Sequence, residues 1–244
     1  MSRADDLLKT ALMGLGDKPP DDSAAPVKKR YSERVSAAAA LAIAGELRYR
    51  GLREARPAPP GVLDTSGAER RMAGGIGAKK VDVTWTTGES GLLLGISIKS
   101  INFRDQGTNN FQKNLTNRRG DMLFEGVTLH RRFPYAVLGG LFFLDVGAES
   151  DDTARRRSTF LNAHNRLKLF TGRNDPGGRD EQYEHLYILL LESCATFANY
   201  RVFCVGDPDN EVPLDRALED LLKATAVRNP DFYEYDNGVL RTAS

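Results

Sequence analysis

Two ionisable residues, Asp82 and Lys99, lie in segments whose other residues are mostly apolar, VDVTW and GLLLGISIK. An unpaired charge inside a sheet costs free energy, so these side chains are expected to be solvated, paired or functional. Hydrolysis of a phosphodiester needs a hard cation, and one or two carboxylates can hold Mg²⁺. A lysine beside that cation can orient the attacking water and the scissile phosphate. The alternative is a structural cross-strand ion pair, worth ~0.2–1 kcal/mol.

The two segments are expected to form a β-hairpin, because apolar and polar residues alternate along 79–100. A turn of two or four residues places Asp82 opposite Gly95 and on the same face as Lys99. Ser97 shares that face. The other face would carry core residues, namely Val81, Val83, Ile96 and Ile98. A three-residue turn would instead move Asp82 to the core face.

The rest of the chain predicts the elements that hold this hairpin. Helices are expected over about 32–52 and 116–132, and the apolar run YAVLGGLFFLD (135–145) is typical of a strand covered on both faces. Strands interleaved with helices indicate a single α/β domain over residues 31–244, preceded by a weakly ordered arm at 1–30. The remaining predicted elements are a helix at 152–170, strands near 186–191 and 201–205, and a helix from about 213.

The order helix, strand with Asp, strand with x-x-Lys, helix resembles the PD-(D/E)XK nuclease superfamily over about residues 32–145. The context GGIGAKKVDVTW and GISIKSINFRD is also similar to restriction-endonuclease-like proteins of bacteria. The resemblance implies a restriction-endonuclease-like core, with a central mixed β-sheet flanked by helices. It implies that Asp82 and the backbone carbonyl of Ile98 bind the metal and that Lys99 is catalytic. The implied cofactor is Mg²⁺, with Mn²⁺ as a substitute.

Ser97 departs from the family pattern, which usually has Glu or Asp at this position. A serine hydroxyl is a weak, neutral ligand, so another acid is expected to complete the site. Glu46, on the first predicted helix, matches the acidic residue that many members carry before the motif, and Glu69 is the second candidate. The predicted catalytic residues are Asp82, Ser97, Lys99 and Glu46.

Polar and basic residues follow the motif in NFRDQGTNNFQKNLTNRRG. Such side chains donate hydrogen bonds to phosphates and read base edges, although a polar surface loop would have a similar composition. A further basic cluster stands at 155–157, and the net charge of +1 neither supports nor excludes a nucleic-acid groove. The predicted DNA contacts are Arg104, Lys113, Asn114, Arg118 and Arg119.

These observations favour a cytoplasmic, Mg²⁺-dependent DNA endonuclease acting in restriction or phage defence. A homodimer is expected, because one active site cuts one strand and two-fold symmetry is the simplest way to cut both. A methyltransferase or another defence-system protein would be a natural partner. The alternative from another class is a non-catalytic nucleic-acid-binding or assembly subunit that kept the fold. No apolar run is long enough for a membrane span, and two cysteines fit a reducing compartment.

Overall fold

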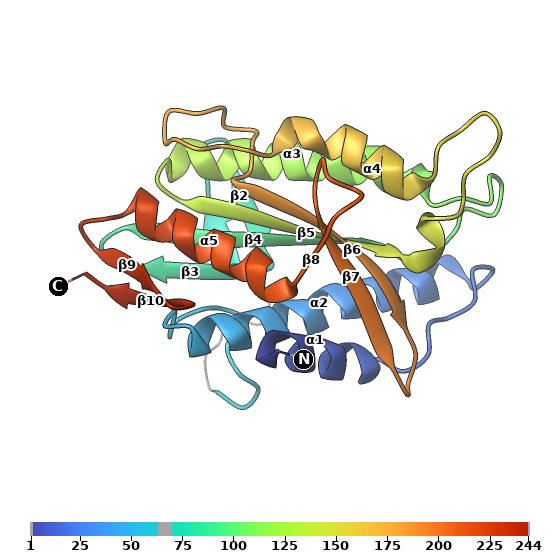
Figure 1. Cartoon of the computed structure of the whole chain (residues 1–244), viewed down its shortest axis with the longest axis horizontal. Helices are drawn as coiled ribbons and strands as arrows, with labels where there is room; N and C mark the ends of the chain where they lie inside the picture. The colour runs from blue at the N-terminus through green and yellow to red at the C-terminus, as the bar shows by residue number, and fades with distance from the viewer. Residues whose placement is uncertain (1, 63–69, 244) are drawn as a thin grey trace.

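The centre of the molecule is a six-stranded mixed β-sheet. The computed structural model describes residues 2–62 and 70–243, and the strands lie in the order β3-β4-β5-β6-β7-β8 (Figure 1). Strands β4, β5 and β6 are parallel, whereas β3, β7 and β8 pair antiparallel with their neighbours. The strands are β3 Val83–Thr87, β4 Gly91–Ile101, β5 Val137–Asp145, β6 His185–Ser193, β7 Ala198–Cys204 and β8 Glu211–Val212.

Helices cover both faces of this sheet, which confirms the predicted α/β class. In the described part of the chain they are α1 Arg3–Met13, α2 Ala25–Tyr49, α3 Leu115–Arg132, α4 Thr159–Leu167 and α5 Leu214–Arg228. Helices α1, α2 and α5 pack on one face, and α3 and α4 pack on the other (Figure 1). No helix among the described residues has the length and apolar character needed to span a membrane.

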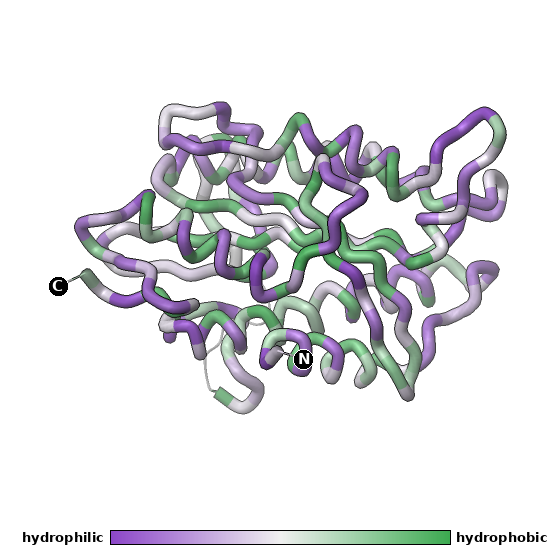
Figure 2. Tube along the Cα trace, in the orientation of Figure 1, coloured by the Kyte–Doolittle hydropathy of each residue, from purple (hydrophilic) through white to green (hydrophobic). Residues whose placement is uncertain are grey.

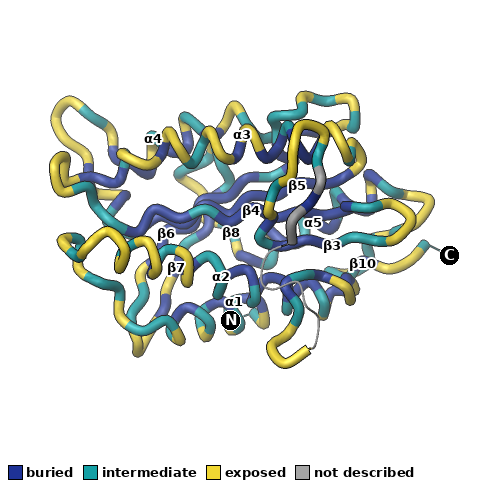
Figure 3. The backbone as a smooth tube through the Cα atoms, turned by 180° about the vertical axis from the view of Figure 1, so that it is seen from behind, coloured by how far each residue is buried: buried dark blue, intermediate teal, exposed yellow. Residues whose placement is uncertain are grey.

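The sheet separates two hydrophobic cores, and its central strands are buried on both sides (Figures 2 and 3). Strand β5 shows why its sequence is nearly all apolar: Leu141 and Phe143 belong to the core under α2 and α5, whereas Leu138 and Phe142 belong to the core under α3 and α4. The predicted strand at 135–145 is therefore confirmed. Gly139 leaves room for Leu221 of α5, because a Cβ there would lie 2.7 Å from its Cδ2.

The first thirty residues differ from the expected weakly ordered arm. Ser2 caps α1 through a capping box with Asp5, and Leu8 and Leu12 of this helix are fully buried against α2. Helix α2 starts at Ala25, earlier than the predicted residue 32, with Pro26 in its first turn. The short apolar patch at the N-terminus is thus one side of an amphipathic helix that completes the core.

The β3–β4 hairpin forms, but its register differs from the predicted one. The turn has three residues, Gly88 to Ser90, and Thr87 pairs with Gly91. A β-bulge then adds one residue to β4, so that Trp85 pairs with Leu94 and Val83 with Ile96. A three-residue turn alone would have moved Asp82 to the other face. The bulge compensates for it, and the extended register brings Asp82 opposite Ser97 instead of Gly95.

Asp82 itself lies at a bend between β3 and a small separate hairpin, β1 Arg70–Ala73 and β2 Ala78–Val81. Because the chain bends there, Val81 belongs to the core under α3 and not to the core that contains Val83. The prediction that both valines share one face is therefore wrong. The hairpin is docked on α3, where the Gly75 N–H donates to the Thr128 carbonyl at 2.8 Å.

Two further elements differ from the sequence-based expectation. Helix α4 starts at Thr159 and not near residue 152, because residues 153–156 form a tight turn with paired backbone hydrogen bonds. A short hairpin near the C-terminus, β9 Tyr233–Asp236 and β10 Val239–Thr242, was not predicted. Its two-residue turn is Asn237-Gly238, both with positive φ, which is the type I′ pattern of tight hairpins.

Candidate active site at the open edge of strand β4

Strand β4 is longer than β3, and this difference creates an open edge. Strand β3 pairs with β4 only as far as Ile96, whereas β4 continues to Ile101. The other edge of β4 is paired with β5 along its whole second half. Backbone groups of residues 97–101 that point away from β5 therefore face a space that β3 leaves uncovered.

Asp82 closes the start of this open edge. Its Oδ2 accepts a hydrogen bond of 2.6 Å from the Ile98 N–H, in place of the strand partner that β3 would have supplied. The N–H and C=O of one strand residue point to the same edge, so the Ile98 carbonyl also faces the open side, beside Asp82. Two oxygen ligands predicted from the sequence thus come together.

Lys99 lies between two carboxylates. Its Nζ is 3.8 Å from Asp82 Oδ2 and 3.2 Å from Glu125 Oε2. Burial disfavours the charged form of this lysine, but Glu125 and Asp82 outweigh burial and raise the pKa of Lys99 above its usual value. The side chain is therefore a cation at neutral pH, held at the bottom of the open edge.

Glu125 is the residue that the sequence analysis missed. It comes from α3, and only 3% of its side chain is exposed. It lies on the buried stripe of that helix, three residues after Met122 and four before Leu129, both of them core residues. A carboxylate at an apolar helix position was the available signal, since such a group needs a specific partner. It packs on the same face of the sheet as Lys99.

Ser97 lies in the same buried corner but contributes no charge. Its side chain is 2% exposed, and its hydroxyl has no hydrogen-bond partner among the described residues. The Tyr183 hydroxyl donates to the Met122 carbonyl of α3 at 3.1 Å, and burial raises the pKa of this tyrosine well above its usual value. Tyr183 is therefore neutral, and Ser97 belongs to the packing between β4 and α3.

Glu46 does not join the site. Its carboxylate pairs with Arg3 of α1 and with Arg50 at 2.7 Å, and Arg50 also pairs with Asp215 of α5. This network lies under α1, α2 and α5, on the sheet face opposite Glu125. Glu46 therefore joins three helices, and the structure gives the position near Lys99 to Glu125. Glu69, the second candidate acid, lies outside the described residues.

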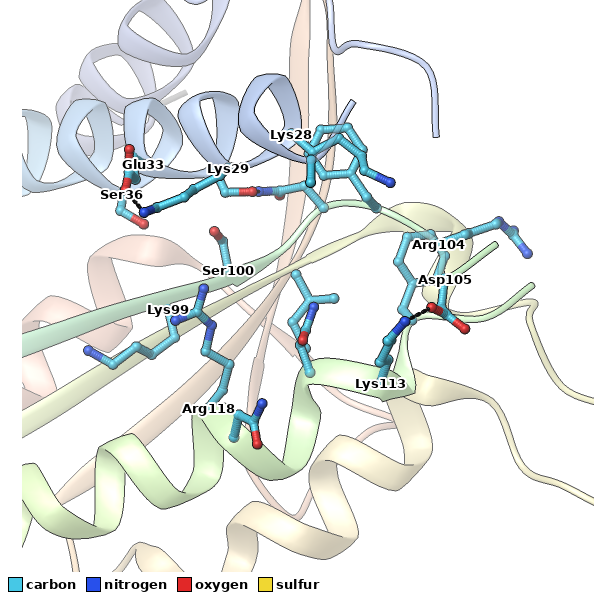
Figure 4. A pocket seen from close by; sticks show the side chains of 18 of the residues that line it. Lys28, Lys29, Glu33, Ser36, Lys99, Ser100, Arg104, Asp105, Lys113 and Arg118 are labelled. Atoms are coloured by element: carbon cyan, nitrogen blue, oxygen red, sulfur yellow. Dashed lines mark hydrogen bonds and ion pairs between the residues drawn. The ribbon is translucent and has the colours of Figure 1, made fainter. Parts of the chain in front are cut away.

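A groove of about 1090 Å³ runs along the open edge between α2 and α3. Figure 4 shows Lys28 and Lys29 of α2 on one wall, Arg118 of α3 on the other, and Lys99 between them. Six basic side chains line the groove: Lys28, Lys29, Lys99, Arg104, Lys113 and Arg118. The acidic side chains along it are Glu33, Asp82, Asp105 and Asp121.

Four of the five predicted DNA contacts line this groove, namely Arg104, Lys113, Asn114 and Arg118. Lys113 is paired with Asp105, and Arg118 lies 3.7 Å from Asp121. Arg119, also on α3, is not among the described groove residues. Lys28 and Lys29 of α2 were not among the predicted DNA contacts, and the fold brings them to the groove opposite Arg118.

The described residues contain no group of three His, Cys, Asp or Glu side chains arranged to hold a metal ion. Among residues 2–62 and 70–243, two carboxylates lie beside Lys99, those of Asp82 and Glu125, and the Ile98 carbonyl adds a further oxygen. This donor set is all oxygen, which suits a hard cation such as Mg²⁺ that keeps several of its waters.

Comparison with known proteins identifies no relative: no protein-family model, no curated protein and no solved structure matches the chain.

Proposed function

We propose that this chain is a metal-dependent nuclease that hydrolyses DNA phosphodiester bonds at the open edge of β4. The observation that carries the proposal is the position of Lys99, a half-buried cation between the carboxylates of Asp82 and Glu125 at the floor of a basic groove. A structural ion pair would need only one of these acids and no groove. The order α2, β3, β4, α3, β5 supports the finer assignment to a restriction-endonuclease-like core.

The proposed metal-binding residues are Asp82, Glu125 and the Ile98 carbonyl. A divalent cation, Mg²⁺ or Mn²⁺, would there neutralise the phosphate and lower the pKa of the attacking water. Asp82 is held for this role by the Ile98 N–H, which donates a hydrogen bond to Oδ2. Glu125 is fixed by its burial in α3 and by Lys99.

The protein's own cations would bind and orient the substrate. Lys99 has three N–H donors, and a phosphate oxygen can replace one carboxylate as its partner. Arg118 faces the groove from the α3 wall. Its guanidinium can bind two oxygens of one phosphate. Lys28 and Lys29 on the opposite wall would hold the strand in place by charge alone.

We further propose that the enzyme acts on duplex DNA as a homodimer in restriction or phage defence. The support for the dimer is chemical: the described part of the chain holds one such site, and one site cuts one strand. A methyltransferase or similar defence protein would protect host DNA from it.

Plasmid cleavage tests the proposal. Purified protein should nick or linearise a plasmid with Mg²⁺ and stop when EDTA is added. Asp82→Asn keeps the acceptor for the Ile98 N–H but removes the charge, and Lys99→Met keeps the packing but removes the cation. Each should slow cleavage by about 100-fold or more while plasmid binding persists. Wild-type protein that binds plasmid without cutting it would support the non-catalytic alternative and overturn the proposal.

A further inference from the structure

Three consecutive arginines, Arg155, Arg156 and Arg157, lie at a tight turn outside the groove. Residues 153–156 close it through two backbone hydrogen bonds between Thr153 and Arg156. Asp151, which is 5% exposed, anchors it: its carboxylate accepts hydrogen bonds from the Thr159 N–H and hydroxyl and from the Phe111 N–H. A turn fixed by a buried carboxylate presents its side chains in a defined direction.

The three arginines have different environments. Arg156 is held at the base of the turn by the Asp151 carbonyl and carboxylate. Arg155 and Arg157 are exposed, and within the described chain neither guanidinium has a hydrogen-bond or ion-pair partner. Of the nearby acids, Glu149 is already paired with Arg201 at 2.5 Å, and only Asp152 remains. The turn thus carries two unneutralised cations.

This turn adjoins one end of the groove. Phe111, whose N–H binds Asp151, lines the groove, and the next residue, Gln112, donates its side-chain N–H to the Arg157 carbonyl at 3.4 Å. Arg104 and Lys113 lie at this same end of the groove (Figure 4), and the loops that contain the two features are neighbours in Figure 1. The turn is therefore attached to this end of the groove.

We propose that Arg155 and Arg157 form a second phosphate-binding surface, which holds the nucleic acid beyond the groove. This inference rests on the proposed function for the identity of the ligand. Guanidinium groups suit phosphate oxygens, and the surface would act only on a strand long enough to leave the groove and reach the turn. The preferred substrate would then be a polynucleotide and not a short oligonucleotide.

Equilibrium binding in EDTA, where no cleavage occurs, tests this surface. The variant is Arg155→Gln with Arg157→Gln. The matched control is Arg53→Gln with Arg241→Gln, which removes the same charge from the region where β10 meets the end of α2. For an oligonucleotide of about 30 nucleotides, the variant should reduce the slope of log affinity against log salt by about two, and the control should leave it unchanged.

A shorter oligonucleotide tests whether the effect of the variant on binding depends on the length of the strand. With an oligonucleotide of about six nucleotides, the variant should bind like the wild type, because such a strand fills only the groove. Equal slopes for variant and control on the longer strand would overturn the inference. So would loss of binding to vesicles containing anionic lipid with unchanged DNA binding, which would make the turn a membrane contact.

The result is independent of catalysis. A protein that fails to cut plasmid but shows the reduced slope would keep the second surface and refute the nuclease. A protein that cuts plasmid but shows equal slopes for the variant and the control would keep the nuclease proposal and refute the second surface.

Discussion

Lys99 holds together groups that would otherwise repel each other. Asp82 and Glu125 both approach its ammonium, so the formal charges of these three groups sum to one negative charge. In the proposed site, this negative charge would favour binding of a divalent cation, and a phosphate held by that cation would lie beside the lysine. The second carboxylate would then come from a helix and not from the strand, which would account for Ser97 at a position where the family that the sequence resembles usually has an acid.

Glu125→Gln and Glu46→Gln separate the two buried glutamates. Glu125→Gln should reduce plasmid cleavage by about 100-fold and raise the Mg²⁺ concentration needed for half-maximal rate, because one anionic ligand is lost. Glu46→Gln should leave the rate of the folded enzyme near that of the wild type. It should lower the free energy of unfolding by about 3 kcal/mol, because Arg50 is left buried beside one fewer acid.

Cleavage assays across a Mg²⁺ titration and urea unfolding of both variants provide the measurements. Ser97→Ala serves as the control, since it removes a hydroxyl from the same corner without changing charge. If Glu46→Gln abolished cleavage while Glu125→Gln did not, Glu125 would be a structural partner of Lys99 alone.

At the scale of elements, the hairpin shows what alternation can and cannot predict. The alternating pattern indicated both strands and the face shared by Asp82, Ser97 and Lys99. It could not indicate the turn length or the bulge at Leu93, since a run of three leucines at 92–94 looks the same with or without an extra residue. The three-residue turn shifts the pairing by one residue, and the bulge shifts it by one more. The register therefore moves by two residues in total, and Asp82, Ser97 and Lys99 stay on one face.

Helix positions were harder to interpret. Glu46 and Glu125 are both acids on helices beside the sheet. The pairing of Glu46 with Arg50, four residues on, is a spacing visible in the sequence, whereas its pairing with Arg3 and that of Glu125 with Lys99 are tertiary contacts. The N-terminal helix was missed because a breaker-rich stretch follows it. The signal for the last hairpin was present in Asn237-Gly238, a tight-turn pair with strand-like residues on both sides.

Docking of the β1–β2 hairpin on α3 should control the position of Asp82. A Cβ on Gly74 would overlap the side chain and carbonyl of Thr128. Gly74→Val should therefore detach the hairpin and, because Asp82 directly follows β2, reduce the cleavage rate about tenfold or more with little change in DNA affinity. The control is Gly120→Ala on α3, where a Cβ meets open space. It should leave cleavage unchanged and stabilise the fold by about 0.5–1 kcal/mol.

Single-turnover cleavage and equilibrium binding of the two glycine variants distinguish rate from affinity. An unchanged cleavage rate in a folded Gly74→Val protein would show that Asp82 is positioned by β3 alone.

For the molecule as a whole, the decrease in the free energy of unfolding at acidic pH should depend on His164. This histidine is buried in α4, its Nδ1 accepts a hydrogen bond from the Gly206 N–H at 3.1 Å, and burial lowers its pKa to about 4 despite the nearby Asp207 and Asp209. In the unfolded chain it takes up a proton near pH 6.5, so stability should fall as pH drops from about 6.5 to about 4. The loss should be about 2 kcal/mol after allowance for partial solvation.

His164→Gln keeps an acceptor for Gly206 and removes the titrating group, so its unfolding free energy should fall less over the same pH range. His185 shifts in the same direction and remains in both proteins, whereas Asp5 and Glu184, whose pKa values are lowered, lose their contribution only at more acidic pH. Identical pH profiles for wild type and variant in chemical denaturation would contradict this assignment.

The contacts between the two ends of the chain have a consequence for biosynthesis. Tyr200 donates to Asp5 at 2.6 Å, Arg50 pairs with Asp215, and the Leu240 N–H donates to the Arg50 carbonyl at 2.8 Å. Helix α2, which supplies one wall of the groove, is therefore held by residues that are translated after Asp82 and Lys99. A nascent chain would contain these two residues before its groove could bind a polynucleotide. For the proposed nuclease, the groove would be complete only after α5 and β10 have been made, so shorter nascent chains would leave the DNA of the cell intact.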